Sequence, residues 1–231
     1  MAPPSQLSPS RHTAFAALKA GLDNAAFAAP RPRVGSLIPS AVPALDRVLG
    51  GGFPKGSLVT LEGPAGRWSI AASLVASVTR RSVAAIVDDG ALYPPDLARS
   101  GARLERVLIV PAQSPLSVAR AADVLVRSKA CRLVLVPVPE LRAAIWMRLA
   151  GLAHRTGILL VAVAPPHAAA ARIAPLAAAA AVRLYCTRGR LELEGKRGVW
   201  CTIAGYDVCA EVRKHRTAIP EKRAVARAAV C

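Results

Sequence analysis

The sequence predicts an α/β fold in which a mainly parallel sheet is covered by helices on both faces and extended by antiparallel strands near the C-terminus. Three observations support this prediction. Short apolar segments alternate with helical stretches through the middle of the chain, which is typical of parallel strands buried on both faces. A glycine-bounded turn joins the first of these segments to a helix. After residue 181 the apolar residues alternate and glycines separate the segments, which favours antiparallel hairpins.

The predicted parallel strands are short apolar runs, and the helices between them carry apolar residues at helical spacing. The strands are Ser57–Glu62, Ser82–Val87, Arg106–Val110, Arg132–Val138 and Ile158–Ala164. The helices are Leu45–Leu49, Ile70–Arg80, Pro94–Gly101, Leu116–Ser128 and Leu141–Thr156.

The sequence of the C-terminal part predicts short antiparallel strands with turns at Gly189, Gly195–Gly198 and Gly205. These strands are Val182–Thr187, Arg190–Glu194, Trp200–Ile203 and Tyr206–Arg213. The whole chain then divides into an N-terminal arm with a helix (1–33), a core (34–220) and a basic C-terminal tail or frayed helix (221–231).

The composition is that of a globular protein with room for one α/β domain, since 53% of the 231 residues are hydrophobic and 19% are charged. The net charge is +17, from 31 Lys and Arg against 14 Asp and Glu. Such a charge favours nucleic acid as a partner, and an anionic membrane surface less so. Because the cations are mostly Arg in an Ala-rich chain, compositional bias is an open alternative.

Several classes of protein are excluded by the pattern of apolar residues and cysteines. No apolar run approaches the roughly twenty residues of a membrane span, and the N-terminus does not resemble a secretory signal. The five cysteines are scattered without a CxxC pair, and the four histidines are isolated. We therefore expect a cytoplasmic protein with no metal site and with reduced, mostly buried thiols.

The turn after the first strand resembles a phosphate-binding loop that lacks the side chains which bind the phosphates and Mg²⁺. A working loop places six residues from first to second glycine and then Lys and Ser or Thr, which reach the phosphates and Mg²⁺. Counting from Gly63, the second glycine is Gly66, Arg67 stands at the Lys position and Trp68 at the hydroxyl position, with Ser69 behind it. The open alternative is a plain tight turn. We interpret Gly63, Gly66, Arg67 and Ser69 as a vestigial nucleotide-binding loop.

Other positions that nucleotide hydrolysis would use also lack the required groups. Asp89 follows the second strand where a carboxylate would activate water, but no Glu is present there. The strand ending at Pro137 offers no Asp for Mg²⁺. Glu140 is the nearest carboxylate, and we interpret it as an acidic residue at the start of the helix that follows. We therefore predict no ATP hydrolysis and at most weak ATP binding.

Three segments, together with the series of strands and helices between them, carry a resemblance to the RecA family over roughly residues 36–225. Residues 38–56 resemble the lead into the RecA phosphate loop, and residues 86–94 resemble the segment that holds a catalytic Glu in those ATPases. Residues 214–220 resemble the Lys-Asn-Lys motif through which one RecA subunit reaches its neighbour's ATP. The resemblance implies a RecA-like P-loop fold and a subunit or phosphate contact by Lys214 and Arg216.

Within that family, the pattern of losses most resembles ImuA, the RecA-like accessory protein of bacterial SOS mutagenesis. This resemblance implies a non-catalytic scaffold in translesion DNA synthesis. Its implied partners are an ImuB-type protein and a DnaE-type polymerase, with RecA itself, DNA and a second copy as further candidates.

A late cluster of cations supports an alternative function, a module that binds single-stranded or damaged DNA. The candidate residues are Arg188, Arg190, Lys196, Arg197, Arg213, Lys222 and Arg223. A solvated charged face is the simpler interpretation of the same residues. A weakly nucleotide-binding, recombinase-like ATPase is the third alternative.

Overall fold

The structure, a computed structural model, describes residues 37–90, 92–196, 200–216 and 223–229, and it describes only the backbone of residues 196, 201–205 and 223–229. The predicted N-terminal arm, 1–33, lies outside these residues, as do Arg197 and Lys222. All described residues belong to one compact unit, Val34–Cys231.

An eight-stranded sheet organises the described residues, with strand order β10-β9-β8-β3-β7-β6-β4-β5. Its strands are β3 (Leu58–Glu62), β4 (Ala84–Asp88), β5 (Val107–Pro111), β6 (Leu133–Pro137), β7 (Leu159–Val163), β8 (Val182–Lys196), β9 (Trp200–His215) and β10 (Arg223–Ala229). The strands from β8 to β5 pair in parallel, whereas β9 and β10 are antiparallel to their neighbours. This arrangement confirms the predicted fold class.

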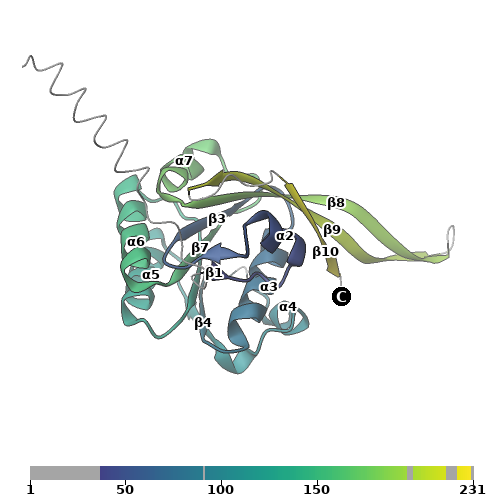
Figure 1. The fold of residues 1–231 in the computed structure, drawn as a ribbon, viewed down its shortest axis with the longest axis horizontal. Helices are drawn as coiled ribbons and strands as arrows, with labels where there is room; N and C mark the ends of the chain where they lie inside the picture. The colour runs from purple at the N-terminus through teal and green to yellow at the C-terminus, as the bar shows by residue number, and fades with distance from the viewer. Residues whose placement is uncertain (1–36, 91, 197–199, 217–222, 230–231) are drawn as a thin grey trace, which may run out of the picture. The chain divides into compact units, whose positions relative to one another are not determined.

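Helices cover both faces of the parallel strands (Figure 1). One face carries α2 (Pro43–Val48), α3 (Arg67–Thr79) and α4 (Pro94–Arg99), and the other carries α5 (Pro115–Ser128), α6 (Ala143–Thr156) and α7 (Ala170–Ala179). A small antiparallel pair, β1 (Leu37–Ile38) and β2 (Phe53–Pro54), precedes β3. Among the described residues, none of these helices is both long enough and apolar enough to cross a membrane.

Alternation along each strand divides the core into two layers. In β3, Val59 and Leu61 pack in the layer with α3, whereas Leu58 packs in the layer with α6 and α7. The remaining positions on the α7 side of β3, Thr60 and Glu62, are polar yet buried. Because parallel strands are normally apolar on both faces, these two residues mark an exception that the functional site explains.

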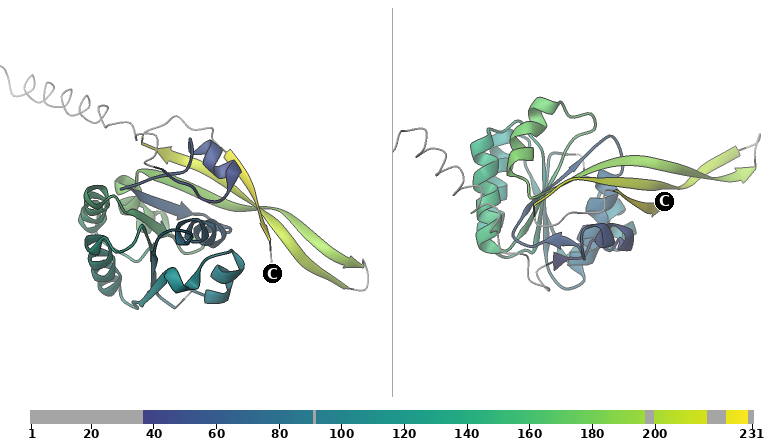
Figure 2. Two further views of the ribbon diagram at one scale, coloured as in Figure 1. Left: turned by 60° about the horizontal axis from the view of Figure 1, so that its bottom comes forward. Right: turned by 45° about the horizontal axis from the view of Figure 1, so that its top comes forward.

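The C-terminal hairpin differs from the prediction of short strands. Instead of turning at Gly189 and Gly205, the chain forms two long strands, β8 and β9, which continue past the helical layers (Figure 2). Irregularities in the pairing fall between Arg188 and Leu191 and between Glu192 and Leu193. A Cβ at Gly189 would lie 2.9 Å from Cβ of Asp207. The glycine therefore permits close strand approach at a bulge rather than a turn.

Three further segments also differ from the sequence-based expectation. Residues 223–229 form strand β10 against β9, so the prediction of a frayed helix there is wrong. Helix α7 was not predicted. Glu140 does not start a helix, because α6 begins at Ala143; its carboxylate instead forms an ion pair with Arg172 at 2.9 Å. The predicted interaction of Glu140 with a helix dipole is therefore wrong.

Candidate functional site

The turn at Gly63–Gly66 packs directly against the C-terminal hairpin. Gly63 and Gly66 both have left-handed backbone conformations, with φ of 106° and 81°. A Cβ on Gly63 would overlap the backbone of Cys186 in β8, and one on Gly66 would overlap the side chain of Val208 in β9. Both glycines are therefore required by backbone conformation and by the closeness of the neighbouring strands.

Arg67, at the position of the phosphate-binding Lys, points into the protein. It is 6% exposed, and its Nη1 donates to the carbonyl oxygen of Ala164, just after β7, at 2.7 Å. Its Nε is buried without a hydrogen-bond partner among the described residues. Burial lowers the pKa of Arg67, and the nearby Cys186 opposes that shift. The guanidinium thus links the start of α3 to the end of β7.

The other side chains of the turn face in two directions. The Ser69 hydroxyl lies 2.9 Å from the Tyr206 hydroxyl of β9 and hydrogen-bonds with it. Trp68 lines a pocket of about 250 Å³, together with Asp89 and Pro137. No three His, Cys, Asp or Glu side chains come together as metal ligands would in the part of the chain that the structure describes.

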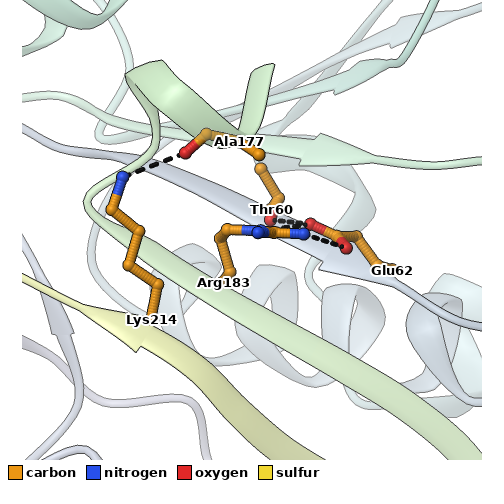
Figure 3. Close-up of polar contacts among 5 residues, drawn as sticks. All are labelled: Thr60, Glu62, Ala177, Arg183 and Lys214. Carbon is orange, nitrogen blue, oxygen red and sulfur yellow. Dashed lines mark hydrogen bonds and ion pairs between the residues drawn. The ribbon is translucent and has the colours of Figure 1, made fainter. Parts of the chain in front are cut away.

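A buried ion pair lies beside the turn, on the α7 side of the sheet (Figure 3). Arg183 of β8 donates from Nε and Nη2 to the two carboxylate oxygens of Glu62, at 2.9 and 2.8 Å. The Thr60 hydroxyl donates to the same carboxylate at 2.8 Å. The hydrogen bond to Glu62 raises the pKa of Arg183 against the opposing effect of burial. The side chain of Glu62 is 7% exposed and that of Arg183 is 24% exposed, so the carboxylate is largely removed from water and the guanidinium is half-buried.

Lys214, predicted to contact a neighbouring subunit or a phosphate, binds the end of α7. Its Nζ donates to the carbonyl oxygen of Ala177 at 2.9 Å (Figure 3). It also donates to the carbonyl oxygen of Ala178 at 3.2 Å. A cation at this end of a helix is favourable because the last carbonyl groups lack partners within the helix. Burial lowers the pKa of Lys214, and Arg216 and Arg183 lower it further. Arg216 is exposed, and its backbone N–H donates to Ala181 at 2.9 Å.

The structure describes the side chains of three of the candidate DNA-binding cations, Arg188, Arg190 and Arg213. Arg188 and Arg190 are exposed on β8. Arg213 lies on β9 with its guanidinium carbon 3.5 Å from the centre of the Tyr185 ring. Lys196 and Arg223 lie in β8 and β10, where the structure describes only the backbone.

Two of the cysteines lie on strands of the hairpin, with Cys186 on β8 and Cys209 on β9. Cys186 is buried between the turn and the sheet. Burial raises its pKa to about 12, although Arg67 acts in the opposite direction. The thiol is therefore protonated at neutral pH and packs as a small apolar group.

Sequence reasoning missed the role of Glu62 and Thr60, which it treated only as part of an apolar strand. The signal was present in the alternation of polar residues. Thr60 and Glu62 occupy alternate positions of β3, and Arg183 and Tyr185 occupy alternate positions of β8; the two pairs stand directly opposite each other in the sheet.

Comparisons with known proteins agree with this architecture. The chain is 37% identical to Protein RecA of Picosynechococcus sp. over 103 residues, which are 43% of this chain and 30% of that protein. It is 38% identical to Protein RecA of Prochlorococcus marinus (strain MIT 9211) over 112 residues, covering 47% and 30% of the two chains. The matches thus span less than a third of each RecA protein. No protein-family model matches the chain.

Two solved structures share the fold over most of both chains. The RadB recombinase superposes with a TM-score of 0.61 at 16% identity, covering 82% of this chain and 94% of that one. A KaiC-like protein from Pyrococcus horikoshii superposes with a TM-score of 0.58 at 17% identity, covering 86% and 100%. Together with the partial RecA matches, the sheet order and the turn before α3 establish that this chain has a RecA-like fold.

Proposed function

We propose that this protein is a non-catalytic RecA-like accessory protein of translesion DNA synthesis that binds the proteins of an error-prone polymerase complex. Its proposed partners are an ImuB-type protein and a DnaE-type polymerase, with RecA as a further candidate. The accessory role and the partners come from the resemblance to ImuA. The geometry of the site supports the part of the proposal that says the protein is non-catalytic.

The observation that carries the non-catalytic part is the position of Arg67. In a working phosphate loop the cation at this position reaches the phosphates, whereas the Arg67 guanidinium donates to Ala164 inside the protein. Val208 lies against Gly66, and Ser69 is paired with Tyr206. The side chains of Arg67 and Ser69 therefore each have a hydrogen-bond partner within the fold. Phosphoryl transfer depends on such groups for positioning and charge stabilisation.

The partner-binding part is tested by co-purification of the tagged protein with an ImuB-type protein and with a DnaE-type polymerase. A chain that lacks residues 1–33 tests the contribution of the arm. Deletion of residues 213–231 is unsuitable, because it would remove the end of β9 and all of β10. We expect stable capture by the full chain. If the full chain captures neither partner, the proposal is wrong.

Turnover of ATP is the corresponding test of the non-catalytic part. We expect no turnover above that of a matched preparation of Arg67→Ala. An ATPase activity that co-elutes with the protein and disappears in Arg67→Ala would contradict this part and favour the third alternative, a recombinase-like ATPase.

Direct DNA binding is the second candidate function, and the exposed cations of β8 favour it. The side chains of Arg188 and Arg190 make no hydrogen bond or ion pair to another described residue, and both residues are exposed. Binding of a single-stranded oligonucleotide should weaken steeply with salt, because each neutralised phosphate releases counterions. The double variant Arg188→Gln with Arg190→Gln should lower the slope of log affinity against log salt concentration by the equivalent of about two phosphate contacts. Binding that is absent at low salt, or insensitive to salt, would exclude this function.

A further inference from the structure

A pocket of about 670 Å³ opens between α7, the end of β3 and the first residues of β8, beside the turn but on the opposite side of the sheet from α3. Its volume is within the range of sites that hold small molecules or anchoring side chains. One wall is the small and apolar side of α7, formed by Ile173, Ala174 and Ala177. The opposite wall holds Tyr185 and the Glu62–Arg183 ion pair.

A bulge in β9 directs a cation to this pocket. Lys214 pairs with Arg183 and Val212 pairs with Leu184, so Arg213 between them has no partner in β8. An extra residue of this kind changes the direction of its side chain. Arg213 consequently lies on the same face as Lys214, with its guanidinium over the Tyr185 ring. Apart from that ring contact, its guanidinium has no hydrogen bond or ion pair to any described residue, so its donors are available.

The charges of the pocket favour a single carboxylate over a chain of phosphates. The Arg183 donors Nε and Nη2 are already bound to Glu62. The Glu62 carboxylate would repel a second anion that came close to this ion pair. Arg213 remains as an available planar fork, which matches a carboxylate in bidentate geometry. A nucleic-acid strand would require a continuing track of cations, but Arg188 and Arg190 do not line this pocket.

We infer that this pocket docks a short segment of a partner protein in which a large apolar side chain is flanked by an acidic residue. The apolar side chain lies between Tyr185 and the small residues of α7, where alanines leave room for it. The flanking carboxylate binds Arg213 at the mouth. This inference rests on the proposed partner-binding function and names the class of segment that is bound.

Fluorescence anisotropy with synthetic peptides tests this inference. The probes carry one Phe, Leu or Trp flanked by Asp or Glu, and the reference peptides carry Lys in place of the acidic residues. Two variants alter the pocket in different ways: Arg213→Gln removes the cation, and Ala174→Phe fills the space without changing charge. Ala174 is exposed, so the larger side chain does not disturb the core.

Two matched variants control for general effects of charge and bulk. Arg190→Gln removes an exposed cation from β8, and Ala171→Phe adds the same ring to α7 outside the pocket. Unchanged urea midpoints verify folding of all four variants. We expect acidic peptides to bind, and each pocket variant to weaken binding about tenfold. Each control should change affinity by no more than about twofold.

Three results would overturn the inference. The first is no preference for acidic over Lys-containing peptides, and the second is that the control variants weaken peptide binding as much as the pocket variants do. The third is that the peptides do not bind, whereas oligothymidylate binds and the pocket variants abolish that binding. Co-purification with the full-length partners separates this inference from the proposed function. If wild-type protein and pocket variants capture the partners equally, the inference fails and the proposed function stands. If wild-type protein captures neither partner, the proposed function itself fails.

Discussion

The direction of the Arg67 side chain determines whether the turn at Gly63–Gly66 has a phosphate-binding or a structural role. The residue stands directly after Gly66, where a cation could face either a bound phosphate or the protein interior. In this structure it faces the interior, and its contact with Ala164 joins the start of α3 to the end of β7. A side chain used in this way contributes to stability, which gives a direct means of separating a structural from a nucleotide-binding role.

Arg67→Ala should lower the free energy of unfolding by about 2–4 kcal/mol, because it removes a charged hydrogen bond and a buried aliphatic stem. Urea denaturation measures the change. Arg81→Ala is the matched control: Arg81 is exposed, and we expect a change within about 0.5 kcal/mol. Unchanged stability combined with lost nucleotide binding would instead place Arg67 at a phosphate.

The Glu62–Arg183 ion pair gives a second prediction for single residues. Glu62→Gln keeps the shape and the hydrogen bond with Thr60 but leaves the Arg183 charge without its partner. We expect a loss of about 2 kcal/mol in the free energy of unfolding. Glu140→Gln serves as the control, because the Glu140–Arg172 pair is exposed and such pairs contribute little. Equal effects of the two substitutions would show that burial of the Glu62 pair has no energetic consequence.

The packing of the turn against the hairpin is the main interaction between elements near the site. Strands β8 and β9 lie so close to the turn that Gly63 and Gly66 have no room for a side chain. In the same region, the Ser69 hydroxyl is bound to Tyr206. The C-terminal hairpin therefore fixes the shape of the turn, although the two are separated by more than a hundred residues in sequence.

Gly66→Ala measures this packing when it is compared with Gly101→Ala. Both glycines have left-handed φ values, 81° and 87°, but a Cβ on Gly101 would have no neighbour within 4 Å. We expect Gly101→Ala to cost about 1 kcal/mol from backbone conformation alone. Gly66→Ala should cost about 2 kcal/mol more from overlap with Val208. Addition of Val208→Ala should recover part of that difference in urea denaturation, and equal costs for the two glycine variants would disprove the close packing.

The elements that the sequence predicted well are those with a strong local pattern. The parallel strands are continuous apolar runs, and they appear within a residue or two of the predicted limits. The long hairpin was predicted as short strands because a glycine in an extended segment has the same local sequence whether it makes a turn or a bulge. Which of these occurs at Gly189 depends on Asp207, across the hairpin.

The site was harder to predict than the fold because its contacts join distant segments. The sequence identified Arg67 as unusual but did not indicate that it would reach Ala164. It assigned Lys214 to a neighbouring subunit or a phosphate, whereas Lys214 binds the end of α7, a helix that the sequence did not reveal. Periodicity predicts which face of an element is buried, but it does not identify the partner of a polar group within that face.

At the scale of the whole molecule, the excess of cations is the dominant electrostatic feature. Even if each of the 14 acidic residues neutralised one cation, 17 of the 31 Lys and Arg would remain without an acidic partner. Several of the ion pairs in the described residues are also exposed, such as Arg99–Asp96 and Arg148–Asp123. Repulsion among the remaining cations opposes the compact state, because folding brings them closer together.

Salt should therefore stabilise this protein. Raising sodium chloride from about 0.05 M to about 0.5 M shortens the screening length several-fold and weakens repulsion between exposed cations. We expect the midpoint of urea unfolding to rise, since urea itself carries no charge. The double variant Arg188→Gln with Arg190→Gln removes two exposed cations from β8 and should show a smaller rise. A midpoint that falls with salt would mean that the attractive exposed pairs, such as Arg99–Asp96 and Arg148–Asp123, outweigh the repulsion among the excess cations.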